Sequence, residues 1–196
     1  MGDREALKAE LAELGAATEA GFAEGGRDVA RIAELAAALE ALNPTPEPAR
    51  AAALLAGRWQ LLWSSFGLQR DSTLARLSFN VLPKDPIRIR ELFQDVDPAT
   101  GLYDNGVVYA GAGGDEGTCV TLGQFTPADG TRLDVRFTDV QTTGHPRVPI
   151  DNAKIPPLWS DVVYLDADFR LNRGSFGSLY VLRLADRAPA RWARDG

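Results

Sequence analysis

The stretch Asp161–Leu184, DVVYLDADFRLNRGSFGSLYVLRL, decides the fold. Apolar side chains occupy every second position of its first half, at Val163, Leu165, Ala167, Phe169 and Leu171. The positions between them hold mostly polar or charged side chains, at Tyr164, Asp166, Asp168, Arg170 and Asn172. Because strand side chains alternate between two faces, this pattern predicts one long strand with an apolar face and a charged face.

Two glycines separate this strand from a second one. Gly174 and Gly177 bracket a short connection, and Ser178–Leu184 is apolar on both faces. A strand followed by a tight glycine-containing turn and another strand is typical of a β-hairpin. We interpret it as the last hairpin of a barrel or of a strongly curved sheet.

The same stretch carries a family resemblance. Tyr164–Leu182, YLDADFRLNRGSFGSLYVL, is similar to the C-terminal signature of the plastid lipid-associated proteins, also called fibrillins or plastoglobulins. Two more segments resemble this family in the same order, LEALNPTPEP at Leu39–Pro48 and LLAGRWQLLWSS at Leu54–Ser65. The resemblance implies a mainly β fold, a lipocalin-like antiparallel barrel. It also implies structural roles for the motif residues, which are Gly57, Trp59, Tyr164, Asp166, Asp168, Arg170, Arg173 and Gly174.

The resemblance further implies a function without catalysis. It points to binding, storage or transport of a small hydrophobic molecule such as an isoprenoid, a carotenoid, a quinone or an acyl lipid. The fold is implied more firmly than the ligand, because one fold hosts many functions. An open alternative is a structural or coat protein on lipid bodies or membranes.

Composition bounds the answer. The chain has 196 residues, 45% hydrophobic and 24% charged, which fits one ordinary globular domain. No run approaches the roughly 18 apolar residues of a membrane span. The N-terminus MGDREALKAE has neither a secretory signal pattern nor an Arg-rich targeting pattern. We therefore expect a bacterial cytoplasmic protein, or a plastid or thylakoid-associated protein whose targeting segment has been removed.

Charge and rare residues disfavour several kinds of chemistry. The net charge of −6 argues against a nucleic-acid partner and against electrostatic attraction to anionic lipid. Cys119 and His145 are the only cysteine and the only histidine. They provide no disulfide, no metal-ligand set and no Ser–His–Asp arrangement, so we expect no metal, no cofactor and no catalytic residue.

The first 48 residues predict two helices and a connector. Leucine and isoleucine recur at helical spacing twice, at Leu7, Leu11 and Leu14 and again at Ile32, Leu35, Leu39 and Leu42. The two helices would form an antiparallel hairpin, followed by the stiff connector NPTPEP. The polar faces carry mostly glutamate, so packing on the barrel is favoured over lying on a lipid surface. We assign 1–48 to this hairpin and connector, 49–186 to the barrel and 187–196 to a tail.

Turn residues divide the barrel region into short strands. A strand at Gly57–Ser65 opens it, and the hairpin described above closes it. Between them we predict five strands, Leu74–Val81, Ile87–Val96, Gly106–Ala112, Thr118–Phe125 and Arg132–Thr142. The total is about eight, as in a small closed barrel.

The pocket predicted inside this barrel follows from strand faces. Trp59, Leu61 and Trp63 share one face of the first strand. The resemblance of Gly57–Arg58–Trp59 to the opening of lipocalin barrels implies that Trp59 plugs the closed end, beneath Arg170 or Arg173. The Pro-rich loop Gln141–Ser160 is longer than a connection needs, so it is either a lid over the barrel mouth or a poorly ordered insertion, and its apolar residues favour the lid. The predicted ligand contacts are Leu61, Trp63, Phe93, Val135, Phe137 and Trp159.

Two carboxylates keep a catalytic hypothesis open. Asp166 and Asp168 would lie about 7 Å apart on one strand face, at a rise of about 3.3 Å per residue. Nearby Arg170 and Arg173 would keep both ionised, which suits a salt-bridge network better than general acid catalysis. Such a network inside the barrel would fix its closure or orient a ligand head group. An enzyme acting on an isoprenoid-like substrate is the weakest of the three functions considered.

Overall fold

The computed structural model describes residues 2–22, 27–67, 69–189 and 192. Eight long antiparallel strands form the barrel: β1 Gly57–Ser64, β3 Pro86–Asp97, β4 Leu102–Gly111, β5 Glu116–Pro127, β6 Arg132–Thr142, β8 Leu158–Leu165, β9 Phe169–Gly174 and β10 Leu179–Asp186. Two short strands, β2 Asp71–Thr73 and β7 Val148–Pro149, pair with β3 and β6. The helices are α1 Gly2–Ala17, α2 Arg27–Ala41, α3 Ala52–Leu55 and α4 Leu74–Leu77.

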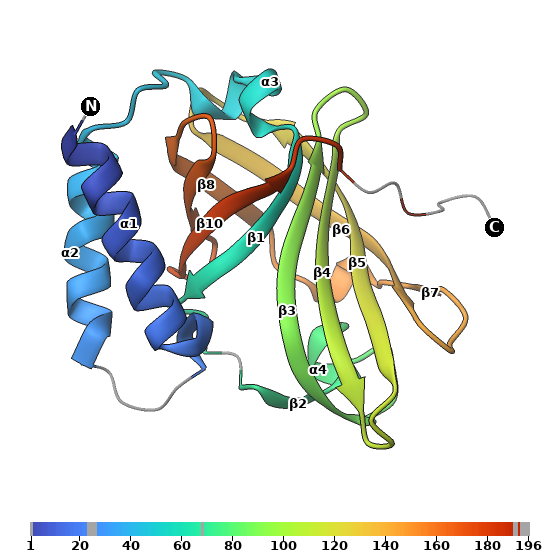
Figure 1. Cartoon of the computed structure of the whole chain (residues 1–196). Helices are drawn as coiled ribbons and strands as arrows, with labels where there is room; N and C mark the ends of the chain where they lie inside the picture. Colours follow the sequence, from blue (N-terminus) through green and yellow to red (C-terminus); the bar gives the residue numbers. More distant parts are fainter. Residues whose placement is uncertain (1, 23–26, 68, 190–191, 193–196) are drawn as a thin grey trace.

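The first strand closes the barrel. β1 pairs with β10 on one side and, over Gly57–Gln60, with β3 on the other. Because every long strand is then bonded to two neighbours, the sheet has no free edge along its main path. The predicted lipocalin-like barrel of about eight strands is confirmed. Beyond Gln60, β1 leaves β3, and Figure 1 shows the two strands splaying apart above β2 and α4.

The N-terminal helices pack on the outside of the barrel. Figure 1 shows α1 and α2 side by side, covering the wall formed by β1, β8 and β10. Their apolar faces meet outward-facing strand residues in one buried cluster, which includes Leu11, Ile32, Leu35, Leu39, Trp63, Tyr164, Phe169, Leu171 and Val181. The predicted helical pair is confirmed, and its apolar stripe is used for packing on the barrel.

The connector after α2 is held against the end of β8. The Asn43 side-chain oxygen accepts a hydrogen bond from the Leu165 backbone N–H at 3.1 Å, and the Thr45 hydroxyl donates to the Leu165 carbonyl at 2.6 Å. The chain then turns through Pro48–Arg50 into α3, which lies over one end of the barrel (Figure 1). Two segments that resemble the family, NPTPEP and YLDADF, therefore contact each other.

The strand predicted at Leu74–Val81 is wrong. The Thr73 hydroxyl accepts a hydrogen bond from the Arg76 backbone N–H, and this cap starts the helical turn α4. Phe79 and Asn80 then adopt positive φ values of 53° and 64°, which an extended strand does not permit. Leu74 and Ala75 are buried and Leu77 packs against the core, whereas Phe79 is 39% exposed.

The single long strand predicted across Asp161–Asn172 is also wrong. The chain reverses at Asp166–Phe169, where the Asp166 N–H donates to the Phe169 carbonyl at 3.1 Å. The Asp166 carboxylate accepts from the backbone N–H groups of Asp168 and Phe169, an Asx-type turn that competes with extended structure. The segment is a hairpin of β8 and β9. The turn predicted at Gly174–Gly177 is present and joins β9 to β10.

The segment predicted as an irregular lid has structure of its own. Within Gln141–Ser160 lie the end of β6, the strand β7, a 3-10 turn at Asn152–Lys154 and the start of β8. Ile150 is buried, and Ile155 and Leu158 pack against the main core. Whether this segment gates the barrel stays a prediction.

Most of the predicted tail lies outside the described residues. Arg187 is described, and its guanidinium donates to the carbonyl groups of Leu54 and Ala56 at the end of α3. Trp192 is also described and packs on the outer face of β3, where its indole N–H donates to Asp95.

Candidate ligand-binding site

A cavity of about 430 Å³ lies inside the barrel. This volume falls within the ~300–1,000 Å³ range of small-molecule pockets. The inward faces of the strands form its wall, and α4 with the residues after it forms one side. Its main apolar lining residues are Leu61, Leu77, Leu92, Tyr103, Val107, Val135, Phe137, Leu158 and Leu182.

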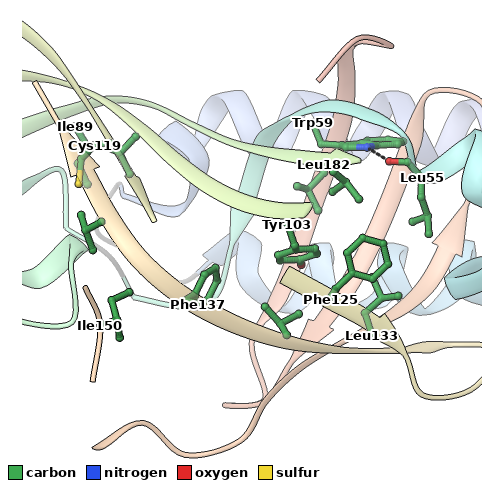
Figure 2. Close-up of a cluster of buried hydrophobic side chains, with 14 of the residues drawn as sticks. Leu55, Trp59, Ile89, Tyr103, Cys119, Phe125, Leu133, Phe137, Ile150 and Leu182 are labelled. Carbon is green, nitrogen blue, oxygen red and sulfur yellow. Dashed lines mark hydrogen bonds between the residues drawn. The ribbon is translucent and has the colours of Figure 1, made fainter. Parts of the chain in front are cut away.

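Two groups of core side chains flank this space. Figure 2 shows Trp59, Tyr103, Phe125, Leu133 and Leu182 gathered toward one end of the buried cluster, and Ile89, Cys119 and Ile150 toward the other, with Phe137 between them. Tyr103, Cys119, Phe137 and Leu182 also border the cavity. The cavity is thus bordered by members of both groups.

Exposed aromatic residues surround the way in. Phe66, Phe79 and Phe176 border the cavity and are 43%, 39% and 62% exposed. The Phe66 and Phe176 ring centroids are 6.4 Å apart, and those of Phe79 and Phe137 are 5.7 Å apart. Contiguous exposed apolar patches are typical of interaction sites, so these side chains make the opening a candidate binding surface.

The closed end carries a buried cation on an aromatic ring. The Trp59 indole donates to the Leu55 carbonyl at 2.9 Å, as drawn in Figure 2, and its ring lies 4.7 Å from the Arg170 guanidinium. Arg170 donates to the Gln94 side-chain oxygen, and Gln94 donates to Asn105 at 2.8 Å. Gln94 and Asn105 border the cavity, so the floor of the site is polar.

Five of the six predicted contacts border the cavity: Leu61, Phe93, Val135, Phe137 and Trp159. That they contact a ligand stays a prediction. Phe93 is a special case, because its ring lies across Gly106, stacked on Trp192 and beneath the Arg58 guanidinium at 4.1 Å. This ring belongs to a separate cluster with Val120 and Leu122. Phe93 therefore borders the cavity at the strand rather than filling it with its side chain.

Trp63 does not line the cavity, so its predicted role is wrong. The register of β1 against β10 shifts between Leu61 and Trp63, which marks a β-bulge. One extra residue turns the following side chain to the opposite face. Trp63 consequently packs outward against the helices, in the cluster that contains Leu11 and Leu35.

Asp166 and Asp168 lie in the β8–β9 turn, not on a strand face, and both bind Lys8 of α1. The Lys8 Nζ lies 3.0 Å from Asp166 Oδ2 and 2.6 Å from Asp168 Oδ1. The Tyr164 hydroxyl also donates to Asp166 at 2.6 Å. The expected partners Arg170 and Arg173 are not involved, because the turn sends Arg170 into the barrel and leaves Arg173 paired with Glu40 of α2.

This environment keeps Asp166 ionised. Burial alone would raise the pKa of Asp166, but the hydrogen bonds from Tyr164, the Asp168 backbone and Lys8 outweigh it and lower that pKa. A general acid at neutral pH needs a raised pKa instead. The two carboxylates anchor the helices and do not border the cavity.

The motif glycines allow close approach. Gly57 has φ of 139°, and a Cβ there would lie 2.5 Å from the Asp186 carbonyl oxygen, so only glycine fits where β1 meets β10. At Gly174, a Cβ would lie 3.0 Å from the Tyr180 ring, which borders the cavity.

Several lining residues escaped the sequence reasoning. Phe66, Phe79 and Phe176 lie in connections whose side-chain direction no periodicity indicates. Gln94 of β3, and Tyr103 and Asn105 of β4, lie at strand positions whose alternation places their side chains on the inward face. Their polarity on an inward face was the signal that would have indicated a polar floor.

Within the described part of the chain, Cys119, possible metal ligands and the helices add no further site. Burial raises the pKa of the Cys119 thiol to about 11, which makes it a poor nucleophile. Across the described ranges, no three His, Cys, Asp or Glu side chains are grouped to hold a metal ion. No helix in the same ranges has the length and apolar character needed to cross a membrane.

The fold and the site define a class of protein, a closed lipocalin-like barrel with an interior apolar cavity. The family model PAP_fibrillin matches residues 5–183, so the chain belongs to the plastid lipid-associated protein, or fibrillin, family. The resemblance found in the sequence is confirmed.

Two sequence relatives, one from Arabidopsis thaliana and one from Cucumis sativus, agree with this assignment. The chain is 26% identical to a probable plastid-lipid-associated protein 2, chloroplastic, of Arabidopsis thaliana, over 92% of this chain and 71% of the relative. It is 28% identical to a chromoplast-specific carotenoid-associated protein of Cucumis sativus, over 90% of this chain and 66% of that protein. A solved lipocalin-like protein from Bacteroides uniformis aligns at a TM-score of 0.34 with 15% identity, covering 66% of this chain and 97% of that one.

Proposed function

We propose that this protein binds one small hydrophobic molecule inside its barrel and exchanges it with a lipid surface, without catalysis. The observation that carries the proposal is the apolar cavity of about 430 Å³ that opens beside exposed phenylalanines. The volume lies in the lower half of the usual pocket range, which favours a single acyl or prenyl chain. A longer molecule would extend through the opening.

Energetics favour exchange over permanent storage. Each methylene taken from water gains about 0.8 kcal/mol, so a long chain is bound strongly from aqueous solution. A chain taken from a membrane gains almost nothing, because it is already out of water. Shape and a few polar contacts must then decide the affinity, and both suit a carrier that releases its ligand to another lipid phase.

The opening suits contact with that phase. Phe66, Phe79 and Phe176 give the rim an apolar surface, and Arg76 borders the cavity beside them. The relatives described above are plastid proteins by name, which supports the plastid alternative for this chain and gives no support to a bacterial cytoplasm. A plastid lipid body or membrane is therefore the proposed donor and acceptor.

Extraction tests the proposal directly. We expect the purified full chain, extracted with organic solvent and examined by mass spectrometry, to release a hydrophobic compound near one per protein. Val135→Phe fills the cavity from β6 and should reduce this amount several-fold, whereas Arg136→Gln on the outward face of the same strand should not change it. An empty extract, together with no uptake of any acyl or prenyl lipid offered, would contradict the carrier function.

The coat function remains the second candidate, and the same exposed phenylalanines favour it. If the outer surface alone is used, flotation with lipid droplets should fall in Phe176→Ser and be unaffected by Val135→Phe. If the chain is a carrier, the amount of bound ligand should fall in Val135→Phe and be unaffected by Phe176→Ser. The catalytic hypothesis is not supported, because Asp166 and Asp168 lie away from the cavity and are engaged by Lys8.

A further inference from the structure

Arg170 is a buried cation that lacks a carboxylate partner. Its side chain is fully buried, and no carboxylate among the described residues influences its charge. One nitrogen, Nη2, donates to the Gln94 side chain. The Nε and Nη1 atoms are buried and have no hydrogen-bond partner.

Two other buried charged side chains of this chain have oppositely charged partners. Asp95 receives two hydrogen bonds from the Arg58 guanidinium, and Lys8 binds two aspartates. Burying a charge without a partner carries a large desolvation penalty. Burial lowers the pKa of Arg170 to about 10, so the guanidinium still carries its charge at neutral pH. An anionic group would supply the partner that the Arg170 guanidinium lacks within the protein.

Packing on Trp59 explains only part of this arrangement. The guanidinium lies 4.7 Å from the ring centroid, a cation–π contact that closes the end of the barrel. That contact uses the face of the guanidinium group, whereas its N–H bonds point outward in the plane. The stacking therefore leaves the two free nitrogen atoms unsatisfied.

The position of Arg170 connects it to the cavity. Along the inward face of β9, Asn172 and Gly174 border the cavity, and Arg170 is the next residue on that face toward the closed end. Leu182, which pairs with Arg170 across β9 and β10, also borders the cavity. Gln94 and Asn105 extend from the guanidinium into the open space and are both hydrogen-bonding side chains.

We propose that the cavity takes an amphiphile with a carboxylate head group, which Arg170 and Asn105 bind at the floor while the apolar tail runs past Phe137 to the opening. Rotation of the Gln94 side chain would free Nη2 of Arg170, which together with an unpartnered neighbouring nitrogen, Nε or Nη1, forms the fork geometry that matches a carboxylate. This inference rests on the proposed carrier function and names the chemical class of its ligand.

A matched pair of ligands tests the inference. Hexadecanoic acid and hexadecan-1-ol share one tail and differ in head-group charge, so calorimetric titration of the full, delipidated chain at pH 7.5 isolates the head. Charge-assisted hydrogen bonds predict that the acid binds roughly tenfold or more tightly than the alcohol. In Arg170→Met, which keeps an unbranched chain over Trp59, the preference should fall below about threefold while alcohol binding remains.

Further variants keep the test decisive. Asn105→Leu should also reduce the preference, and it decides the question if Arg170→Met fails to fold. Arg173→Gln, which removes a cation from the outer face of the same strand, should leave it unchanged. Equal binding of acid and alcohol by the unmodified chain, or an unchanged preference in Arg170→Met or Asn105→Leu, would overturn the carboxylate inference and leave the carrier function intact. Failure of both ligands and of neutral prenyl lipids to bind would instead remove the carrier function itself.

Discussion

The Lys8 ammonium group of α1 lies 2.6 Å from the Asp168 carboxylate in the β8–β9 turn, although 160 positions separate the two residues. The Lys8 side chain is 8% exposed, so this contact is sheltered from water even though Asp168 is largely exposed. It joins the N-terminal helices to the motif YLDADF. The acidic motif of this family segment therefore has a structural use in this chain.

Lys8→Met should loosen the helical pair from the barrel. Removing one partner of a sheltered ion pair leaves the other carboxylates without their counter-charge, so we expect a loss of about 2 kcal/mol in the free energy of unfolding. Urea denaturation measures it. Arg31→Gln is the matched control, because its ion pair with Glu10 joins the two helices at the surface and should contribute at most about 1 kcal/mol. Equal losses in both variants would show that Lys8 is not an anchor.

Stability should also depend on the ionisation of Asp166. Its pKa is lowered in the folded state, so its contribution is present above the unfolded value of about 3.9 and is lost as pH falls through the folded pKa. Asp166→Asn should be less stable than the unmodified chain at pH 7 and should lose less stability between pH 7 and pH 3. The measurement is the free energy of unfolding across this range. Superimposable pH profiles would be inconsistent with the role given to Asp166.

The alternating pattern of Asp161–Asn172 shows how far sequence reasoning reaches. It indicated extended, half-apolar chain correctly, but it continued without interruption through a turn of two residues, Ala167 and Asp168. Leu165 pairs with Arg170 across this turn, so Leu165 and the even-numbered residues after the turn share a face. Leu165 consequently faces the barrel core, whereas Phe169 packs outward on the helices.

Helices, turns and strand-rich segments were predictable because each follows from local spacing. The barrel itself was predicted with help from the family resemblance. The site was less predictable, since its open volume depends on where α4 and the connections that carry Phe66, Phe79 and Phe176 lie against the barrel. A hydrophobic residue such as Phe66, in a connection with no periodicity, gives no sign of facing a cavity rather than solvent.

Gly15 allows α1 to approach β1. A Cβ at this position would lie 2.6 Å from the Leu62 carbonyl oxygen, so Gly15→Ala must push the helix away. We expect a loss of about 1–3 kcal/mol in the free energy of unfolding, even though alanine favours helix by about 1 kcal/mol over glycine. The control Ala9→Gly, on the exposed face of α1, should cost about 1 kcal/mol through propensity alone. Stabilisation by Gly15→Ala in thermal or urea unfolding would show that the approach is not tight.

Cys119 should report on the interior. Burial raises its pKa to about 11 and hides its sulfur, so at pH 8 it should react with a small alkylating reagent far more slowly than an exposed cysteine. Because Cys119 borders the cavity, a bound ligand should slow the reaction further. Mass spectrometry of the time course, with and without added lipid, measures both effects. Labelling as fast as in the urea-unfolded chain would mean that the thiol is accessible.

The bulge in β1 directs the side chains of Leu61 and Trp63 to opposite faces of the strand, and truncating each one tests this. Trp63 packs against the helices, so Trp63→Ala should cost about 3–5 kcal/mol of stability and leave ligand affinity unchanged at temperatures where the chain stays folded. Leu61, two positions earlier, borders the cavity and is only partly buried, so Leu61→Ala should lower ligand affinity with a smaller loss of stability. Urea unfolding and lipid titration of both variants measure the two quantities separately. If Trp63→Ala and Leu61→Ala both lost affinity, the two side chains would act from one face as in an unbroken strand, and the bulge would have no functional consequence.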